Sequence, residues 1–171
     1  RCSALVAIGP ATFAPERPSF APMGAVAEGA MPAMLGSDFL FWGAMQVMRD
    51  RMIGTMLATD PALVHAASLD DRARVDRILR DILPVSRRQR GLMNDAVLAA
   101  NPAEQELEKI VAPTLAISLE DDRFGTYDAA RHLAARIPDA SMVGFPTGGH
   151  VWVGHDAELF AAVDEFLKAV P

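Results

Sequence analysis

Three short apolar segments constrain the fold more than any other feature of this sequence. They cover residues 4–8, 114–118 and 141–145, and each is bounded by Gly, Pro or Asp. Apolar and polar residues do not alternate within them, and continuous apolar runs of this length are typical of parallel strands that are covered on both faces. We therefore predict an α/β fold with a mostly parallel sheet of about three strands.

Helical patterns follow the second and third of these segments. Residues 126–136 carry apolar residues at helical spacing, and Thr126 is suited to cap the N-terminus of this helix. A strand–helix–strand unit of this length is the usual crossover between parallel strands. Residues 157–170 show the same apolar spacing, with Asp156 as the predicted N-cap.

The long stretch between the first and second apolar segments is rich in Ala and Met and carries four signals for helix starts. These signals are Asp38, Asp60 followed by Pro61, Ser68 and Ser86. Such residues accept hydrogen bonds from the free N–H groups of a first helical turn. A simple crossover needs one helix, so the excess predicts a helical subdomain inserted into the sheet domain.

Composition excludes several classes of function. Among the 171 residues, 16 Lys and Arg against 22 Asp and Glu give a net charge of −6, which argues against a nucleic-acid partner because phosphate binding needs a basic surface. Cys2 is the single cysteine, so an internal disulfide and a cysteine-based zinc site are excluded and a cytoplasmic location is predicted. The longest apolar stretch, residues 23–48, contains Glu28 and Asp38, which argues against a membrane span.

Polar residues follow the second and third predicted strands. Asp121 and Asp122 come after the second strand, and His150 lies in the glycine-rich loop 146–155 after the third. The carboxyl ends of parallel strands meet at one edge of a sheet, where ligands and catalytic groups gather. A carboxylate beside a histidine fixes the tautomer of the imidazole and stabilises its cation, as a general base requires. The sequence therefore predicts an acid–histidine pair at this edge.

Several segments resemble the C-terminal third of the α/β-hydrolase superfamily. They are residues 110–117, the pair Asp121-Asp122, residues 129–138 and the triplet Gly148-Gly149-His150. The resemblance implies that residues 4–8 are the sixth strand of that fold and that the helical insertion is the cap between its sixth and seventh strands. It divides the chain into a first strand with its connection (1–17), a helical cap or lid (18–109) and a C-terminal core with the acid and histidine loops (110–171).

The resemblance also implies catalytic roles. The family places its acid in a Gly-x-x-Asp turn after the seventh strand and its histidine after the eighth strand, which implies Asp122 and His150. Leu119 stands where the family usually has Gly, so Asp121 remains an alternative acid. The nucleophile of the family lies in a Gly-x-Ser-x-Gly elbow, and no serine of this chain has glycines two residues before and after it. We therefore expect a fragment that contributes the acid and the histidine of a triad, lacks the nucleophile and is inactive alone.

Apolar side chains near the predicted catalytic edge are candidates for a substrate pocket. The candidates are Trp152, Trp42, Met45 and Phe124. Methionine-rich walls adapt to varied apolar ligands, so we expect the parent hydrolase to act on a small apolar ester or carbonyl compound, with no cofactor and no metal. A sheet of three strands leaves an apolar edge uncovered, which predicts homodimerisation or aggregation.

Two other functions stay open on the sequence. With an Asp nucleophile the parent would be a haloalkane dehalogenase or an epoxide hydrolase, in which His150 activates water against an alkyl-enzyme ester. A non-catalytic domain would instead use the apolar surface of the helical insertion to bind a ligand or a protein partner. The residues of this chain do not separate these functions, because one fold hosts many reactions.

Overall fold

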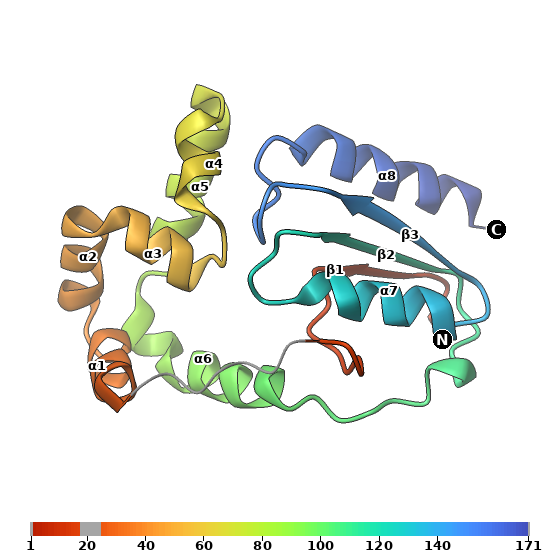
Figure 1. The fold of residues 1–171 in the computed structure, drawn as a ribbon, viewed down its shortest axis with the longest axis horizontal. Coiled ribbons are helices and arrows are strands. Elements are labelled where there is room, and N and C mark those ends of the chain that lie inside the picture. The colour runs from red at the N-terminus through yellow and green to blue at the C-terminus, as the bar shows by residue number, and fades with distance from the viewer. Residues whose placement is uncertain (1, 18–24, 171) are drawn as a thin grey trace.

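The computed structural model describes residues 2–17 and 25–170 (Figure 1). Its elements, in chain order, are β1 (Leu5–Ile8), α1 (Ala25–Leu35), α2 (Asp38–Val47), α3 (Arg49–Met56), α4 (Pro61–Ala66), α5 (Leu69–Asp81), α6 (Val85–Ala100), η1 (Leu107–Lys109, a 3₁₀ helix), β2 (Thr114–Leu119), α7 (Thr126–Arg136), β3 (Ala140–Phe145) and α8 (Asp156–Ala169). The predicted start of the helical region, residue 18, lies outside the described residues. Within the described ranges, no helix is long and apolar enough to cross a membrane.

The three strands form one parallel sheet in the order β1-β2-β3, which confirms the predicted α/β architecture. Leu5 pairs with Thr114, and Thr114 pairs in turn with Ala140. The central strand β2 is buried at all six of its residues, because it has a strand on each side and a helix over each face. Its continuous apolar sequence reflects this double burial.

Helices α7 and α8 cover opposite faces of the sheet (Figure 1). On one face, Leu133 of α7 packs with Ala7 of β1, and Leu107 of η1 joins the same cluster. On the other face, Leu159 of α8 packs against Leu115 of β2. Successive residues of a strand point to opposite faces, so β2 divides its side chains between two apolar cores.

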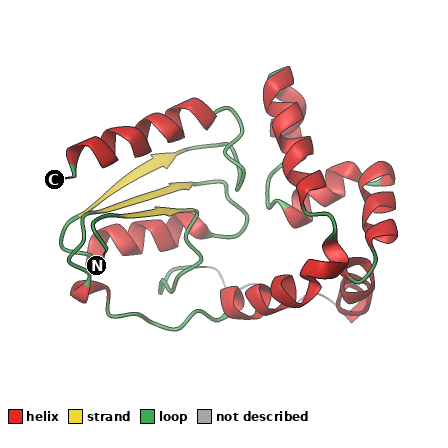
Figure 2. Cartoon of the chain, turned by 180° about the vertical axis from the view of Figure 1, so that it is seen from behind, coloured by secondary structure: helices red, strands yellow, loops and turns green. Residues whose placement is uncertain are grey.

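Helices α1 to α6 form a subdomain beyond the carboxyl ends of the strands, and the strand arrows point toward it in both views (Figures 1 and 2). The fully buried side chains of its core include Phe41, Ile53, Val64, Val75 and Val85. Val151 and Val153, from the loop after β3, belong to the same apolar cluster. The subdomain therefore packs directly against the loop that carries His150.

Some apolar side chains of the sheet domain stay exposed. In the described part of the sheet, β1 has a strand neighbour on one side, through β2. Val111, Phe160 and Leu167 are each more than half exposed. The expected homodimerisation through exposed apolar surface stays a prediction.

Two of the four predicted helix starts in the subdomain are confirmed. The Asp60 carboxylate accepts a hydrogen bond from the Ala62 N–H at the start of α4. The Ser68 hydroxyl accepts one from the Asp71 N–H at the start of α5. Each of these side chains satisfies a backbone donor that has no partner inside its own helix.

The other two predicted caps in the subdomain are wrong. Ser37 caps α2, and the Asp38 carboxylate instead accepts hydrogen bonds from the backbone N–H and the hydroxyl of Ser86. Helix α6 begins one residue before Ser86, at Val85. A contact between the starts of two helices thus replaces two local capping interactions, and residues 48 positions apart in the chain make that contact.

The predicted caps of α7 and α8 are each displaced by one residue. Helix α7 follows Gly125, whose φ is +64°, and Thr126 is its first residue. Helix α8 follows His155, and Asp156 is its first residue. The Thr126 hydroxyl is therefore not a cap, and it hydrogen-bonds Asp122 instead.

The packing of α8 on the sheet can be tested at Leu159. Leu159→Ala is expected to lower the free energy of unfolding by about 2–5 kcal/mol, because it leaves a cavity at a side chain that is 1% exposed. Leu167→Ala on the same helix is the control, and at a half-exposed site it should change stability by about 0.5 kcal/mol or less. Urea unfolding measures both. Equal effects of the two substitutions would contradict this packing.

Candidate active site

The predicted acid–histidine pair is present in the structure. Nδ1 of His150, in the loop after β3, lies 2.8 Å from Oδ2 of Asp122, in the loop after β2. The Asp122 side chain is 1% exposed and the His150 side chain is 32% exposed. An ionised carboxylate only accepts hydrogen bonds, so Nδ1 carries a proton, and in the neutral imidazole Nε2 is left as an acceptor. Among the described residues, none hydrogen-bonds Nε2.

A tight turn after β2 presents the Asp122 carboxylate. The Asp122 N–H donates to the Leu119 carbonyl, and the Gly125 N–H donates to the Asp122 carbonyl. The carboxylate itself accepts the Phe124 N–H at Oδ1 (2.8 Å) and the Thr126 hydroxyl at Oδ2. Hydrogen bonds therefore hold both the backbone and the side chain of Asp122 in place.

The electrostatics of Asp122 follow from these contacts. Burial by itself raises the pKa of Asp122, because the charged form loses solvation. The hydrogen bond and positive charge of His150, with hydrogen bonds from Thr126 and the Phe124 N–H, more than offset this and hold the pKa below its usual value. Asp122 is thus ionised at neutral pH.

Asp121, the alternative acid, makes different contacts. Its carboxylate accepts the N–H groups of Gly148 (3.1 Å) and Gly149 (2.8 Å). Asp121 therefore ties the acid loop to the histidine loop through backbone groups. Of the two neighbouring aspartates, Asp122 is the one that hydrogen-bonds the imidazole.

The glycines before His150 are required by space and by backbone conformation. Gly149 has φ +63°, and a Cβ there would lie 2.5 Å from Thr59 Oγ1. Thr59 belongs to the helical subdomain and is fully buried, with its hydroxyl donating to the Leu57 carbonyl and accepting from the Val151 N–H. The subdomain thus contacts the histidine loop directly at Gly149 and Val151.

Phe124 is the one predicted pocket residue that the structure brings to His150. The two rings meet edge to face with centroids 4.8 Å apart. A Cβ at Gly9 would lie 3.3 Å from His150 Cε1, so the loop after β1 also borders the ring.

The other predicted pocket residues lie elsewhere. The Trp152 indole packs with Leu159 and donates to Asp156 (3.2 Å). Met45 is buried in the core of the helical subdomain. Trp42 is half exposed and lies with Phe39, Leu83 and Pro84 along a shallow, open depression of the surface. The structure does not place any of the three against the imidazole.

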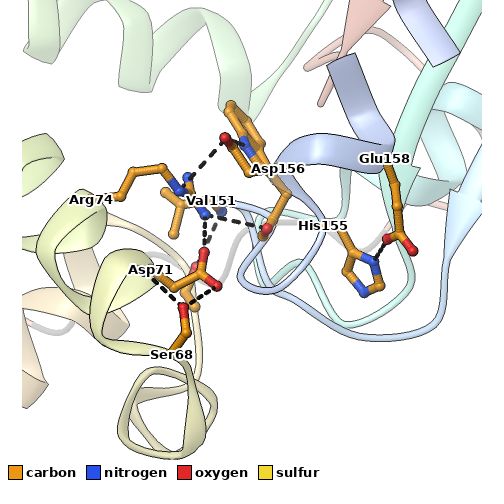
Figure 3. A network of polar contacts seen from close by, with 9 residues as sticks. Ser68, Asp71, Arg74, Val151, His155, Asp156 and Glu158 are labelled. Atoms are coloured by element: carbon orange, nitrogen blue, oxygen red, sulfur yellow. Dashed lines mark hydrogen bonds and ion pairs between the residues drawn. The ribbon is translucent and has the colours of Figure 1, made fainter. Parts of the chain in front are cut away.

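A second polar network joins α5 to the chain after His150 (Figure 3). Arg74 donates to Asp71 (3.1 Å) and to the Trp152 carbonyl (3.3 Å), and its Nε lies 3.6 Å from Asp156. Burial raises the pKa of Asp71, but hydrogen bonds from Arg74, the Gly154 N–H and Ser68 outweigh this and lower it. This network fixes the helical subdomain to the histidine loop.

His155 belongs to that loop but not to the acid–histidine pair. Its Nδ1 contacts Glu158, and its ring stacks on Phe145 with centroids 4.5 Å apart. In the described part of the chain, no group of three or more His, Cys, Asp or Glu side chains is arranged to hold a metal ion.

Sequence reasoning missed three residues that shape the site. Thr59 carries no local signal, because its role depends on the packing of the subdomain. Gly9 could have been found, since it follows a strand that ends at the same edge as the other two. The sequence predicts Thr126 as a helix cap, whereas its contact with Asp122 depends on the turn between the two residues.

The parallel sheet, the helical insertion and the two loops at the carboxyl edge define a partial α/β-hydrolase fold. Solved structures agree. A protein titled an alpha/beta hydrolase fold protein from Nakamurella multipartita matches 99% of this chain with a TM-score of 0.54 at 23% identity. The protein Rv0554 from Mycobacterium tuberculosis matches 99% with a TM-score of 0.51 at 18% identity. At these identities the likeness establishes the fold alone.

The chain spans less than two thirds of both structures, 62% of the first and 57% of the second. No protein-family model matches the sequence. No curated protein matches it significantly.

The low pKa of Asp122 predicts a pH-dependent stability. A carboxylate whose pKa is lowered by folding stabilises the fold above its unfolded-state pKa of about 3.9, and this contribution is lost as the pH falls through the folded-state value. The stability difference between the wild type and Asp122→Asn should therefore be fully present above the unfolded-state pKa and shrink as the pH falls below about 4. Urea unfolding across a pH series measures it.

Asp164→Asn is the control for that series, because this α8 carboxylate is 64% exposed. It should change stability by about 0.5 kcal/mol or less near neutral pH. A loss of stability in Asp122→Asn that stays constant from pH 7 to pH 2 would contradict the lowered pKa of Asp122.

Gly149→Ala tests the fit of the histidine loop on Thr59. We expect a loss of about 2–4 kcal/mol, from the left-handed backbone and from a Cβ 2.5 Å from Thr59 Oγ1. Gly91→Ala in α6 is the control, since a Cβ there meets open space, and it should raise stability by about 0.5–1 kcal/mol. Urea unfolding measures both variants. A Gly149→Ala variant as stable as the wild type would contradict the close contact between Gly149 and Thr59.

Proposed function

We propose that this chain is part of an α/β-fold serine hydrolase and supplies Asp122 and His150 as the acid and the base of its triad. One observation carries the proposal. His150 donates from Nδ1 to a buried, ionised carboxylate while Nε2 has no partner among the described residues. This is the arrangement that a general base needs.

In the proposed mechanism, His150 Nε2 takes the proton of a serine hydroxyl as its oxygen attacks an ester carbonyl. Asp122 stays ionised and stabilises the imidazolium that forms. The imidazolium then gives its proton to the leaving alcohol, and the acyl-enzyme is hydrolysed by water activated at the same Nε2. The low pKa of Asp122 supports its part, because the carboxylate must remain charged throughout.

The nucleophile comes, in this proposal, from polypeptide outside the 171 residues. No described serine or cysteine hydrogen-bonds His150, and the structural neighbours have longer chains than this one. The chain alone is then inactive, because triad members act as a unit.

The substrate in this proposal is a small apolar ester. Phe124 places an apolar ring beside the imidazole, and helices α1 to α6 act as the cap over the carboxyl ends of the strands. The helical subdomain is attached to the histidine loop through Thr59 and Arg74, and this attachment supports its assignment as the cap.

Ester hydrolysis tests the proposal. It is measured with short-chain p-nitrophenyl esters on the 171-residue chain and on the longest polypeptide that the same gene encodes around it. In an active polypeptide, His150→Gln is expected to lower kcat/KM by at least about 10³-fold and Asp122→Asn by up to about 10⁴-fold. The matched control is His65→Gln, an exposed histidine of the cap that contacts Asp50, and it should leave kcat/KM unchanged.

Three outcomes would contradict the proposal. Turnover that survives His150→Gln removes the base assignment. Halide release or epoxide opening in place of ester hydrolysis moves the parent to an aspartate nucleophile. Absence of turnover in every polypeptide, together with ligand binding to the helical subdomain, indicates a non-catalytic role.

A further inference from the structure

Two buried hydroxyl groups stand behind the Asp122 carboxylate. Ser118 lies on β2 and Thr126 is the first residue of α7, and each is 1% exposed. Their hydroxyl oxygens are 2.8 Å apart, and the Thr126 hydroxyl also hydrogen-bonds Oδ2 of Asp122. The three polar groups therefore form a continuous chain that ends at His150.

The direction of this chain follows from counting protons. The ionised carboxylate only accepts, so the Thr126 hydroxyl donates to Asp122. A hydroxyl has one proton, so Thr126 must accept from Ser118. The order is thus Ser118 to Thr126 to Asp122, and the carboxylate meets the Nδ1–H of His150 from the other side. Hydrogen bonds in such a chain polarise one another and strengthen the last acceptor contact.

The chain fixes the rotation of the carboxylate. Oδ1 is held by the Phe124 N–H from the turn, and Oδ2 is held by Thr126 from the helix. Rotation of the carboxylate would break both bonds in a site where an unpaired buried charge is costly. The loop after β1 lies beside this hydroxyl, because a Cβ at Gly9 would lie 3.8 Å from Thr126 Oγ1.

We propose that Thr126, and Ser118 through it, are positioning residues for the Asp122–His150 pair. They hold the carboxylate so that Oδ2 faces Nδ1, and this fixes His150 in the tautomer that leaves Nε2 free. The catalytic meaning of this role rests on the proposed function. The tautomer itself is a property of the folded chain and is measured without turnover.

The experiment is ¹⁵N NMR of the histidine side chains in the folded 171-residue chain, under alkaline conditions in which imidazole is neutral. Replacing each of the other three histidines by Gln in turn assigns the His150 signals. The wild type is expected to show a single Nδ1–H tautomer. Thr126→Val, which keeps the shape and removes the hydroxyl, should lose this single tautomer and give a mixture with Nε2–H.

Three further variants sharpen the test. Thr126→Ser keeps the hydroxyl and should retain the wild-type tautomer. Ser118→Ala removes the first donor of the chain and should shift the mixture in the same direction as Thr126→Val, by less. Thr114→Val is the matched control, because Thr114 is a 1% exposed threonine of β2 whose hydroxyl donates to the Ala112 carbonyl, away from Asp122. It should leave the His150 signals unchanged.

The outcomes separate the two proposals. An unchanged tautomer in folded Thr126→Val, or in Ser118→Ala where Thr126→Val does not fold, overturns the positioning role. A Thr126→Ser spectrum like that of Thr126→Val also overturns it, since a variant that keeps the hydroxyl would then lose the single tautomer. In an active polypeptide, Thr126→Val should lower kcat by about 10- to 100-fold with KM unchanged. A tautomer shift in a protein without hydrolase activity would retain the positioning role and reject the proposed function.

Discussion

The buried charge of Asp122 is the interaction on which the rest of the site depends. A carboxylate that is 1% exposed has lost its water, and this costs several kcal/mol unless hydrogen bonds replace it. The replacements come from three places: the turn after β2, the start of α7 and the loop after β3. All three segments donate to the same carboxylate, so the charge ties their positions to one another and orients His150.

The helical subdomain holds the same loops from the other side. Thr59 fills the space that a side chain at Gly149 would need, and Arg123 forms a 2.7 Å ion pair with Asp60 at the start of α4. Val151 and Val153 bury their side chains in the core of the subdomain. Packing of the subdomain therefore helps to hold the histidine loop in one position, because both the sheet and the helices contact this loop.

Much of the sheet could be predicted from the sequence. The three apolar runs correspond to β1, β2 and β3 within one or two residues, because a strand covered on both faces needs apolar residues along its whole length. Helix starts were less predictable. Asp60 and Ser68 bond their own first turns, whereas Asp38 and Ser86 bond each other across a helix–helix contact that local patterns do not contain. Where a polar side chain has both a local and a distant possible partner, tertiary packing decides which of them it bonds.

By itself the sequence determined that acidic residues and His150 follow neighbouring parallel strands, and strand direction alone brings such residues to one edge. Only the tertiary structure decided which aspartate meets the imidazole, because Asp121 and Asp122 differ by one residue and point to different partners. It also decided that Phe124 borders His150 while Trp42 and Met45 belong to the surface and core of the subdomain. The physical reason is that the direction of whole strands decides which loops meet at one edge of the sheet. The choice of a hydrogen-bond partner depends instead on the orientation of a single turn.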